Sequence, residues 1–203
     1  MKNYISLNGH KIELTVEQAE KIKQSLETPN KRLSAVNVGS TFKIGKYEFV
    51  VLEQSGDTTA VILKDLLAER VQFGNSNNFR NSKPDEICRG FAEKLAKEIG
   101  EDNLVLHTVD LTSDDGLKDY GKIVRQVSLL TANLYRRYVE VLDEHKPDEY
   151  WWLATPHSTN AHGNITWVKC VSPSGYLDGI DYYLGGSGVR PFCILKSHIF
   201  VSD

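Results

Sequence analysis

The last third of the chain, residues 151–195, constrains the fold more than any other stretch. It consists of short strand-like runs separated by Gly, Ser, Asn and Asp, which is typical of antiparallel strands joined by turns. It begins with the adjacent pair Trp151 and Trp152 and ends with the tetrapeptide GVRP at 188–191. Adjacent side chains of a strand point to opposite faces. We therefore expect one indole to face the core and the other to face outward or a second element.

Composition bounds the class of protein. A chain of 203 residues with 40% hydrophobic residues predicts one principal domain with a small appendage. The net charge of −3 offers no global basic field, so direct nucleic-acid binding is not expected. No apolar run approaches the roughly 20 residues that span a bilayer, and the polar start does not resemble a secretory signal. Three cysteines without CxxC spacing favour a reducing, cytoplasmic location.

Residues 1–30 predict a β-hairpin followed by a helix. Asn8-Gly9 is typical of a type I′ turn and would place Ile5 opposite Ile12. Thr15 and Gln18 have the spacing of a capping box. A hairpin and three helical turns bury little by themselves, so we expect this unit to dock on the main domain, on a second copy or on a partner. Residues 31–38 are interpreted as a polar linker, and residues 39–203 as the main domain.

Within the main domain, residues 41–44, 47–52 and 59–63 predict an antiparallel meander. Ser82 is placed to cap a helix whose apolar residues recur every four positions until Gly100. A second helix is predicted over roughly 131–144. Together these elements indicate an α+β fold.

Two terminal motifs carry a family resemblance. WWLATP at 151–156 and GVRP at 188–191 resemble the WWLRSP and GVRP motifs of a bacterial and phage family of unknown function. The strand hairpin that opens at Gly39, the Asn81-Ser82 step and the Leu-Leu-Thr step at 129–131 also look like that family. Ala154 stands where members often carry Arg, so any anchoring role of that arginine is absent or moved.

The same ending is similar to C-type-lectin-like domains, including the variable proteins of diversity-generating retroelements. The resemblance implies a C-type-lectin-like α+β domain, with two helices and a twisted antiparallel sheet, behind an N-terminal β-hairpin–helix appendage. It also implies that the stretch between the two motifs forms the ligand-facing surface. Fold alone does not determine function, so no chemistry follows from it.

The candidate binding residues lie between the two motifs and combine aromatic area with adaptable polar groups, as antibody paratopes do. They are His157, Asn160, His162, Asn164, Tyr176, Asp178, Asp181, Tyr182 and Tyr183. The alternative is that these are solvated loop residues, with the rings of Tyr176 and Tyr183 packed onto the body of the domain.

Four further residues are interpreted as structural. Trp151, Trp152 and Trp167 are expected in the core because indoles dominate core energetics. Arg190, within an apolar run, is expected to be buried, with its planar fork on backbone carbonyls or on a carboxylate such as Asp178.

No catalytic residue, metal or cofactor is expected. The spacing of His157 and His162 matches no structural zinc pattern, and calcium requires more carboxylates than Asp178 and Asp181 supply. No GxSxG motif or phosphate-binding loop is present. The formylglycine-generating enzymes that share the C-type-lectin-like fold use a cysteine pair, for which Cys170 and Cys193 are candidates. Their apolar neighbours favour inert burial.

The leading hypothesis is a non-catalytic protein-binding protein of phage or mobile-element origin that acts on a bacterial host protein. One version is an inhibitor of a host defence factor, comparable to anti-CRISPR proteins. Residues 1–30 could also mediate homo-oligomerisation. The alternatives are a lectin-like module for glycans or small molecules, and a formylglycine-generating type of enzyme.

Overall fold

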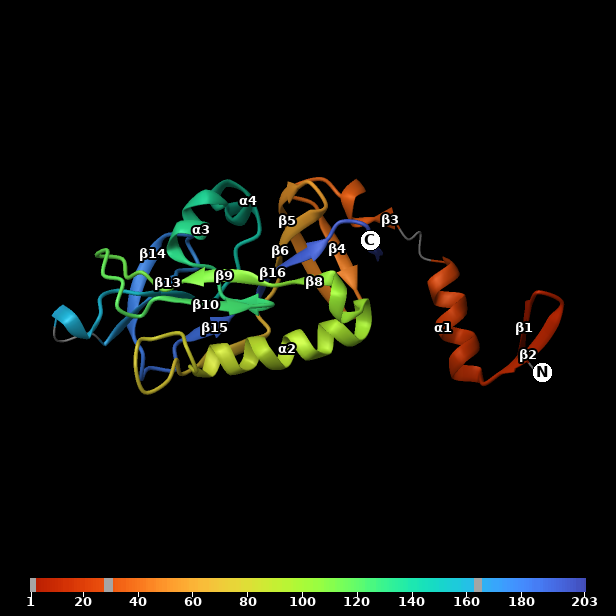
Figure 1. Cartoon of the computed structure of the whole chain (residues 1–203), viewed down its shortest axis with the longest axis horizontal. Helices are drawn as coiled ribbons and strands as arrows, with labels where there is room; N and C mark the ends of the chain where they lie inside the picture. The colour runs from red at the N-terminus through yellow and green to blue at the C-terminus, as the bar shows by residue number, and fades with distance from the viewer. Residues whose placement is uncertain (1–2, 28–30, 163–165) are drawn as a thin grey trace.

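The computed structural model describes residues 3–27, 31–162 and 166–203 and has the α+β class that the sequence predicts. Four α-helices and several mainly antiparallel sheets make up the described part of the chain (Figure 1). Helix α2 runs along one side of the strands in Figure 1, and α3 and α4 lie on the other side.

The N-terminal unit forms as predicted. β1 (Asn3–Leu7) and β2 (His10–Leu14) pair with Ile5 opposite Ile12, and the turn residues Asn8 and Gly9 have φ of 49° and 82°. The Thr15 hydroxyl accepts from the Gln18 N–H at 3.2 Å and the Gln18 side chain accepts from the Thr15 N–H at 2.9 Å, which starts α1 (Val16–Glu27). Figure 1 shows this unit set apart from the other elements.

The segment 31–38 is folded, so the prediction of a polar linker is wrong. β3 (Lys31–Arg32) pairs with β17 (Phe200–Val201), and the 3-10 turn Leu33–Ala35 follows. Leu33 and Val36 are fully buried in the core. These two apolar side chains are sufficient to pack the segment against the domain. The average composition of the segment is polar and does not indicate this packing.

The predicted meander forms one side of the larger sheet. β4 (Thr41–Ile44), β5 (Tyr47–Ser55) and β6 (Thr58–Leu63) pair antiparallel in sequence order. β16 (Phe192–Lys196) continues this sheet beyond β6, so the C-terminal third contributes directly to the first sheet. β11 (Val127–Ser128) and β8 (Leu104–Val105) both pair with β16.

The second sheet has the order β14-β13-β12-β15-β7. Its strands are β14 (Leu177–Asp181), β13 (Trp167–Val171), β12 (Trp151–Pro156), β15 (Ser187–Val189) and β7 (Ala68–Val71). β12 and β15 are parallel, with Trp151 opposite Gly188, so the WWLATP and GVRP motifs lie side by side. The two motifs that dominate the sequence are thus adjacent in space.

A separate two-stranded ribbon crosses the front of the molecule in Figure 1. It is formed by β9 (His107–Asp110) and β10 (Lys122–Arg125), which pair antiparallel. The 3-10 turn Glu101–Asn103 precedes β8, upstream of the ribbon.

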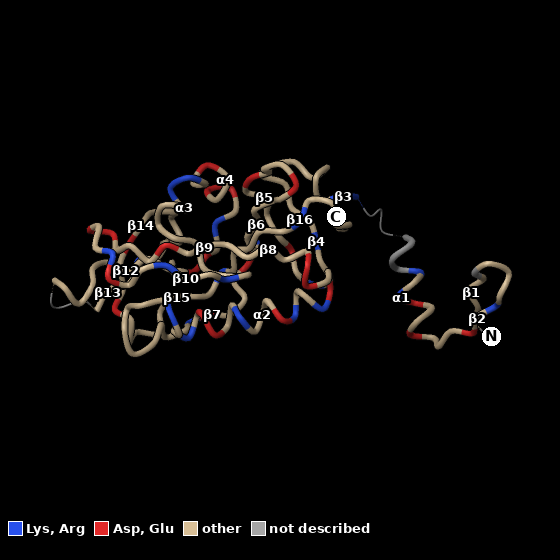
Figure 2. Tube along the Cα trace, in the orientation of Figure 1, with Lys and Arg blue, Asp and Glu red and all other residues tan. Residues whose placement is uncertain are grey.

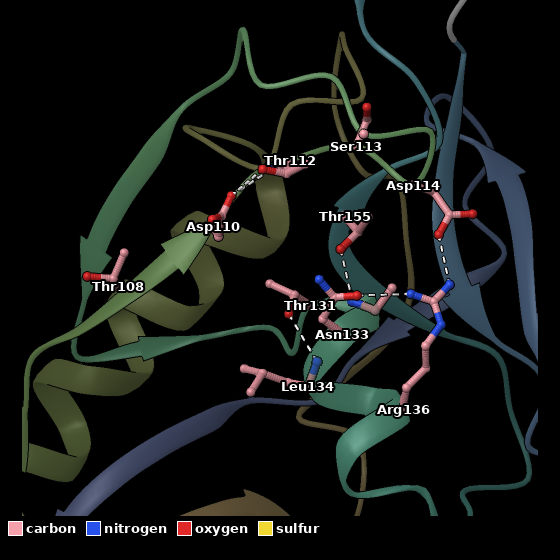
Figure 3. A pocket seen from close by; sticks show the side chains of 12 residues that line it. Thr108, Asp110, Thr112, Ser113, Asp114, Thr131, Asn133, Leu134, Arg136 and Thr155 are labelled. Carbon is pink, nitrogen blue, oxygen red and sulfur yellow. Dashed lines mark hydrogen bonds and ion pairs between the residues drawn. The ribbon is translucent and has the colours of Figure 1, made fainter.

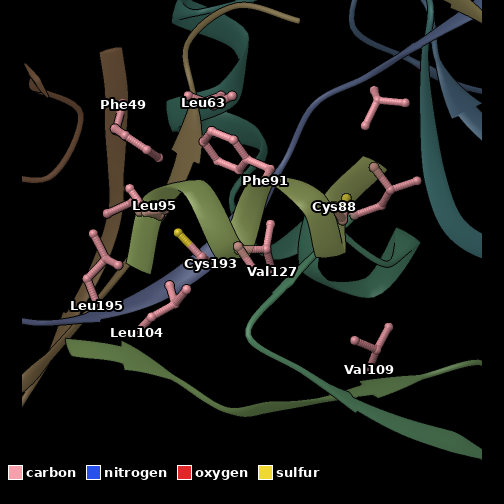
Figure 4. Packing of buried hydrophobic residues seen from close by; sticks show 14 of the residues in the cluster. Phe49, Leu63, Cys88, Phe91, Leu95, Leu104, Val109, Val127, Cys193 and Leu195 are labelled. Carbon is pink, nitrogen blue, oxygen red and sulfur yellow. The ribbon is translucent and has the colours of Figure 1, made fainter. Parts of the chain in front are cut away.

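Helix α2 (Lys83–Ile99) begins and ends where the sequence predicts. The Ser82 hydroxyl accepts from the Asp85 N–H at 3.2 Å, and Gly100 follows the helix with φ of 86°. Its apolar face, with Phe91 and Leu95, packs against the larger sheet (Figure 4). Burial of this stripe is the main force that fixes the helix on the sheet.

The single helix predicted over 131–144 is instead two short helices. α3 (Ala132–Arg137) and α4 (Val139–Glu144) are separated by Tyr138, whose φ of −106° and ψ of 13° leave the helical region. The Tyr138 hydroxyl donates to the Glu53 carboxylate at 2.6 Å. This contact is with β5, far away in the sequence, and no local Gly or Pro marks the break.

The adjacent tryptophans serve two different hydrophobic clusters. Trp152 is 0% exposed and lies in the larger cluster, with its ring 5.3 Å from that of Phe73. Trp151 is 1% exposed and lies in a second cluster under α3, with its ring 5.8 Å from that of Tyr135. Neither indole faces solvent, because α3 covers the side that strand alternation would otherwise expose.

Candidate functional site

The loop between β9 and β10 meets the loop that follows β12 around one carboxylate. Asp115 accepts hydrogen bonds from the Ser113 hydroxyl and, at 2.7 Å, from the Ser158 hydroxyl. The His162 Nδ1 lies 2.9 Å from the Asp115 Oδ2. These contacts, with Ser113 first, hold the pKa of Asp115 well below its usual value. Asp115 is therefore an ionised acceptor that orders the start of the predicted binding segment.

A buried asparagine ties the same loop to the rest of the protein. The Asn77 side chain is fully buried and donates to the carbonyls of Ser158 at 2.8 Å and Trp167 at 3.2 Å. The Tyr120 hydroxyl donates to the Asn77 side-chain oxygen at 2.8 Å. A fully hydrogen-bonded network of this kind rigidifies the segment that it supports.

This polar cluster does not have the geometry of a nucleophilic triad. The Ser158 hydroxyl and the His162 ring both contact Oδ2 of Asp115, whereas a triad places the histidine between the nucleophile and the carboxylate. Among the described residues, no group of three His, Cys, Asp or Glu side chains is arranged to hold a metal ion.

The cysteines are buried and free. Burial raises the pKa of Cys170 to about 12 and also raises the pKa of Cys193. The thiolate is the nucleophilic form of cysteine, so both residues are held in the unreactive form. Neither has the electropositive, partly exposed surroundings of a catalytic cysteine.

The predicted binding residues do not form one patch. β13 and β14 pair with Trp167 opposite Asp181 at one end and Val171 opposite Leu177 at the other. His157, Asp181, Tyr182 and Tyr183 lie at the Trp167 end, and Asn160 and His162 belong to the 3-10 turn Asn160–His162 in the neighbouring loop. Tyr176 precedes β14 at the other end, and Asp178 is opposite Cys170. Asn164 lies outside the described residues.

Trp167 belongs to the exposed surface, and its prediction as a core residue is wrong. It is 48% exposed and its ring lies 5.6 Å from that of His157. The indole lies over Gly179, where an added Cβ would be 3.2 Å from the Trp167 ring. Gly179 lies two residues before Asp181, the residue opposite Trp167 on β14. This glycine is the sequence signal for a tryptophan ring that lies flat across the neighbouring strand.

Tyr183 and Leu184, at the same end, are also about half exposed. We call His157, Trp167, Tyr182, Tyr183 and Leu184 the aromatic end.

Arg190 is fully buried and its role is structural. Its Nε donates to the Leu63 carbonyl at 2.8 Å, and its Nη2 donates to the carbonyls of Lys64 and His145 at 3.0 and 2.8 Å. The guanidinium lies 5.2 Å from the Trp151 ring centroid. Backbone carbonyls therefore hold the Arg190 guanidinium in place, and burial lowers its pKa to about 10.

A groove that the sequence did not predict lies between β9 and α3 (Figure 3). It has a volume of about 490 Å³ and is lined mainly by Thr, Ser, Asp and Asn side chains, with Arg136 at the α3 side. A second hollow of about 370 Å³ shares Thr108 and Leu134 with the first and extends to Glu53 and Arg137. The lining comes from segments far apart in the sequence, so no local pattern indicates the groove.

In comparisons with known proteins, no family model, no curated protein and no solved structure matches the chain. Within the described residues, no helix combines the length and apolar character needed to cross a membrane. The geometry of the site therefore carries the functional argument.

Proposed function

We propose that this protein is a non-catalytic binding protein that recognises another protein through the aromatic end. The observation that carries the proposal is the exposure of large side chains on a rigid base. Trp167 and Tyr183 are 48% and 51% exposed at one end of the β13–β14 ladder. Clusters of exposed aromatic residues supply contact area at low entropic cost and are typical of recognition surfaces.

The rigidity of the base supports the same proposal. Asn77 and Asp115 fix the loops beside Trp167 through hydrogen bonds. A surface that is already ordered loses less conformational entropy when it binds. Binding therefore requires little reorganisation at this end of the molecule.

The finer assignments are also part of this proposal. We propose a C-type-lectin-like fold related to the bacterial and phage family with the WWLRSP and GVRP motifs, supported by the pairing of β12 with β15. Three free cysteines support a reducing, cytoplasmic location. A bacterial host protein, such as a defence factor, is the proposed class of partner.

The experiment is affinity capture from a bacterial lysate with three variants. Trp167→Ala and Tyr183→Ala remove the aromatic end. Tyr176→Ala is the matched control, because Tyr176 is 58% exposed at the opposite end of the same ladder. We expect a stoichiometric partner that is retained by the wild type and by the control and is lost with the other two. Equal capture by all four proteins, or no capture by the wild type, contradicts the proposal. Circular dichroism and thermal melts check that each variant is folded.

A second candidate is a lectin-like module for glycans, and one observation favours it. The groove between β9 and α3 is rich in hydroxyl and carboxylate groups, such as Thr108, Thr112 and Asp110. Sugar recognition would appear as a thermal shift that grows with ligand concentration and is lost in Asp110→Asn. A panel of sugars, with and without calcium, that leaves the melting temperature unchanged excludes this candidate.

A further inference from the structure

Trp167 and Asp181 lie side by side on one face of the β13–β14 ladder. They are opposite each other in the register, and in the adjoining pair the Tyr182 N–H donates to the Thr166 carbonyl at 2.8 Å. Directly opposed residues of an antiparallel ladder alternate between hydrogen-bonded and non-hydrogen-bonded pairs. Trp167 and Asp181 are therefore a non-hydrogen-bonded pair, the kind in which the two side chains approach most closely.

The Asp181 carboxylate has no cationic partner in the described part of the chain. Within residues 3–27, 31–162 and 166–203, no lysine, arginine or histidine forms an ion pair with it. Partial desolvation, and after it the charge of Asp181, raises the pKa of the Tyr183 phenol. Tyr183 is 51% exposed and Trp167 is 48% exposed. An unpaired carboxylate is thus next to two exposed aromatic side chains.

The segment between β9 and β10 brings two more carboxylates to the same end. Asp115 accepts from the Ser158 hydroxyl at 2.7 Å. Asp119 accepts from the Thr159 hydroxyl at 2.5 Å. Both carboxylates therefore lie against the loop that follows β12 and leads to Trp167. Figure 2 shows several acidic positions at the end of the molecule where β12 and β13 are labelled.

The basic side chains near this end do not neutralise these carboxylates. Lys169 on β13 has a side chain that is only 12% exposed and contacts Asp114 at 3.4 Å. Arg70, whose carbonyl lies against Gly185, has its guanidinium 4.0 Å from the Glu149 carboxylate. Lys118 is exposed in the same segment as Asp115 and Asp119, and one lysine cannot balance both of these and Asp181. The surface around Trp167 is therefore negatively charged.

An exposed indole and an unpaired carboxylate attract the same kind of group. The face of an aromatic ring carries a negative electrostatic potential, and tryptophan attracts a cation placed over its face most strongly. A carboxylate accepts a charge-assisted hydrogen bond from that cation. A guanidinium can stack on a ring and donate to a carboxylate at the same time. A neutral or acidic side chain gains neither interaction.

Resting on the proposed function, we infer that the partner protein places a basic side chain, arginine or lysine, against Trp167 and Tyr183, with its charge on the Asp181 carboxylate. Asp115 and Asp119 attract further positive charge on the same partner segment. The proposed function requires only that the aromatic area is covered, and the inference adds the charge of the group that is recognised.

The test uses a displayed library of random peptides of about twelve residues as the probe and selects on the full chain. We expect the selected peptides to be enriched in Arg and Lys. Asp181→Asn keeps the size of the side chain and removes its charge, so it is expected to weaken their binding about fivefold or more. Asp178→Asn is the matched control, because Asp178 is three residues away on the same strand and points to the other face. It is expected to bind as the wild type does.

The same contact is tested from the peptide side. Citrulline in place of the arginine of a selected peptide, or acetyl-lysine in place of the lysine, preserves most of the shape and removes the charge. The change is expected to weaken binding to the wild type about fivefold or more and to have little effect on binding to Asp181→Asn. The two changes remove one shared interaction, so their effects are not additive.

Acrylamide quenching of tryptophan fluorescence keeps the test decisive if Asp181→Asn fails to fold. Of the three tryptophans, Trp151 and Trp152 are buried and Trp167 is about half exposed, so quenching of the wild type reports Trp167. A bound basic peptide is expected to shield Trp167 from the quencher. The neutral version at the same concentration is expected to leave the quenching unchanged.

Three outcomes count against the inference. Selected peptides without an excess of Arg and Lys overturn it, as do peptides that bind Asp181→Asn as tightly as the wild type. A lysate partner that is lost with Trp167→Ala but fully retained by Asp181→Asn also removes it, and in that case the proposed function stands. An empty selection together with an empty capture removes both.

Discussion

Lowering the pH from 7.5 to 5 is expected to reduce the free energy of unfolding, because the fold holds one histidine in its neutral form. His107, on β9, is half-buried and lines the second hollow, with its Nε2 2.9 Å from the Ser128 hydroxyl and its ring 5.2 Å from that of Phe192. Burial lowers the pKa of His107 to about 4, and its Nδ1 has no hydrogen-bond partner among the described residues. An unfolded histidine has a pKa of about 6.5.

The sign and size of the effect follow from these two values. Between pH 6.5 and 4 the unfolded chain binds a proton at this position and the folded protein does not, so the free energy of unfolding falls as the pH falls. The complete effect is about 3 kcal/mol, of which about 2 kcal/mol is lost by pH 5. This is a large fraction of the stability of an ordinary domain.

The assay is urea unfolding at pH 7.5 and pH 5 for the wild type and for His107→Gln. Glutamine keeps a hydrogen-bonding group for Ser128 but does not titrate. We expect the wild type to lose about 2 kcal/mol more than this variant between the two pH values, because all other titrating groups are common to both proteins. The exposed His198, changed to Gln, controls for the substitution itself. A difference between wild type and His107→Gln below about 0.5 kcal/mol, the size of a typical surface effect, would refute the assignment of an imidazole held neutral by the fold.

Two substitutions test the packing around the GVRP motif. Arg190→Ala removes three hydrogen bonds from a fully buried guanidinium to backbone carbonyls and is expected to cost about 4 kcal/mol in urea unfolding, whereas Arg136→Ala breaks an exposed ion pair and is expected to cost less than about 1 kcal/mol. Equal costs would contradict the structural role of Arg190. Gly188→Ala places a Cβ 2.9 Å from the Ala68 carbonyl and is expected to cost about 1–3 kcal/mol, while Gly186→Ala meets no atom within 4 Å and is expected to change stability by less than about 0.5 kcal/mol. A stable Gly188→Ala protein would show that β15 and β7 are not in close contact.

The parts of the fold that the sequence predicts correctly are those decided by neighbouring residues. Asn8-Gly9 fixes its hairpin through the φ angles of two residues, and Ser82 caps α2 through an N–H three positions away. Such contacts are visible in the sequence because both partners lie in the same short window. The break between α3 and α4 was not predicted, because Tyr138 is held by Glu53, which lies on β5.

The candidate site was only partly predictable for the same reason. The aromatic residues after Trp167 were identified from composition, but their division between two ends of a ladder depends on the register of β13 with β14. The core prediction for Trp167 was wrong because its exposure depends on Gly179, a residue of the next strand. The groove combines β9 with α3, which lie in separate segments of the chain, so no local pattern indicates it.

The burial of β12 on both faces has a consequence for how this architecture can diversify. Every residue from Trp151 to Pro156 is buried, and the side chains from Trp151 to Ala154 belong alternately to the two hydrophobic clusters. The strand is therefore a rigid, buried element, and the loops at its two ends are attached to it. Substitutions and insertions in those loops are therefore expected to change the chemistry of the surface at either end of the strand while the buried strand itself stays unchanged.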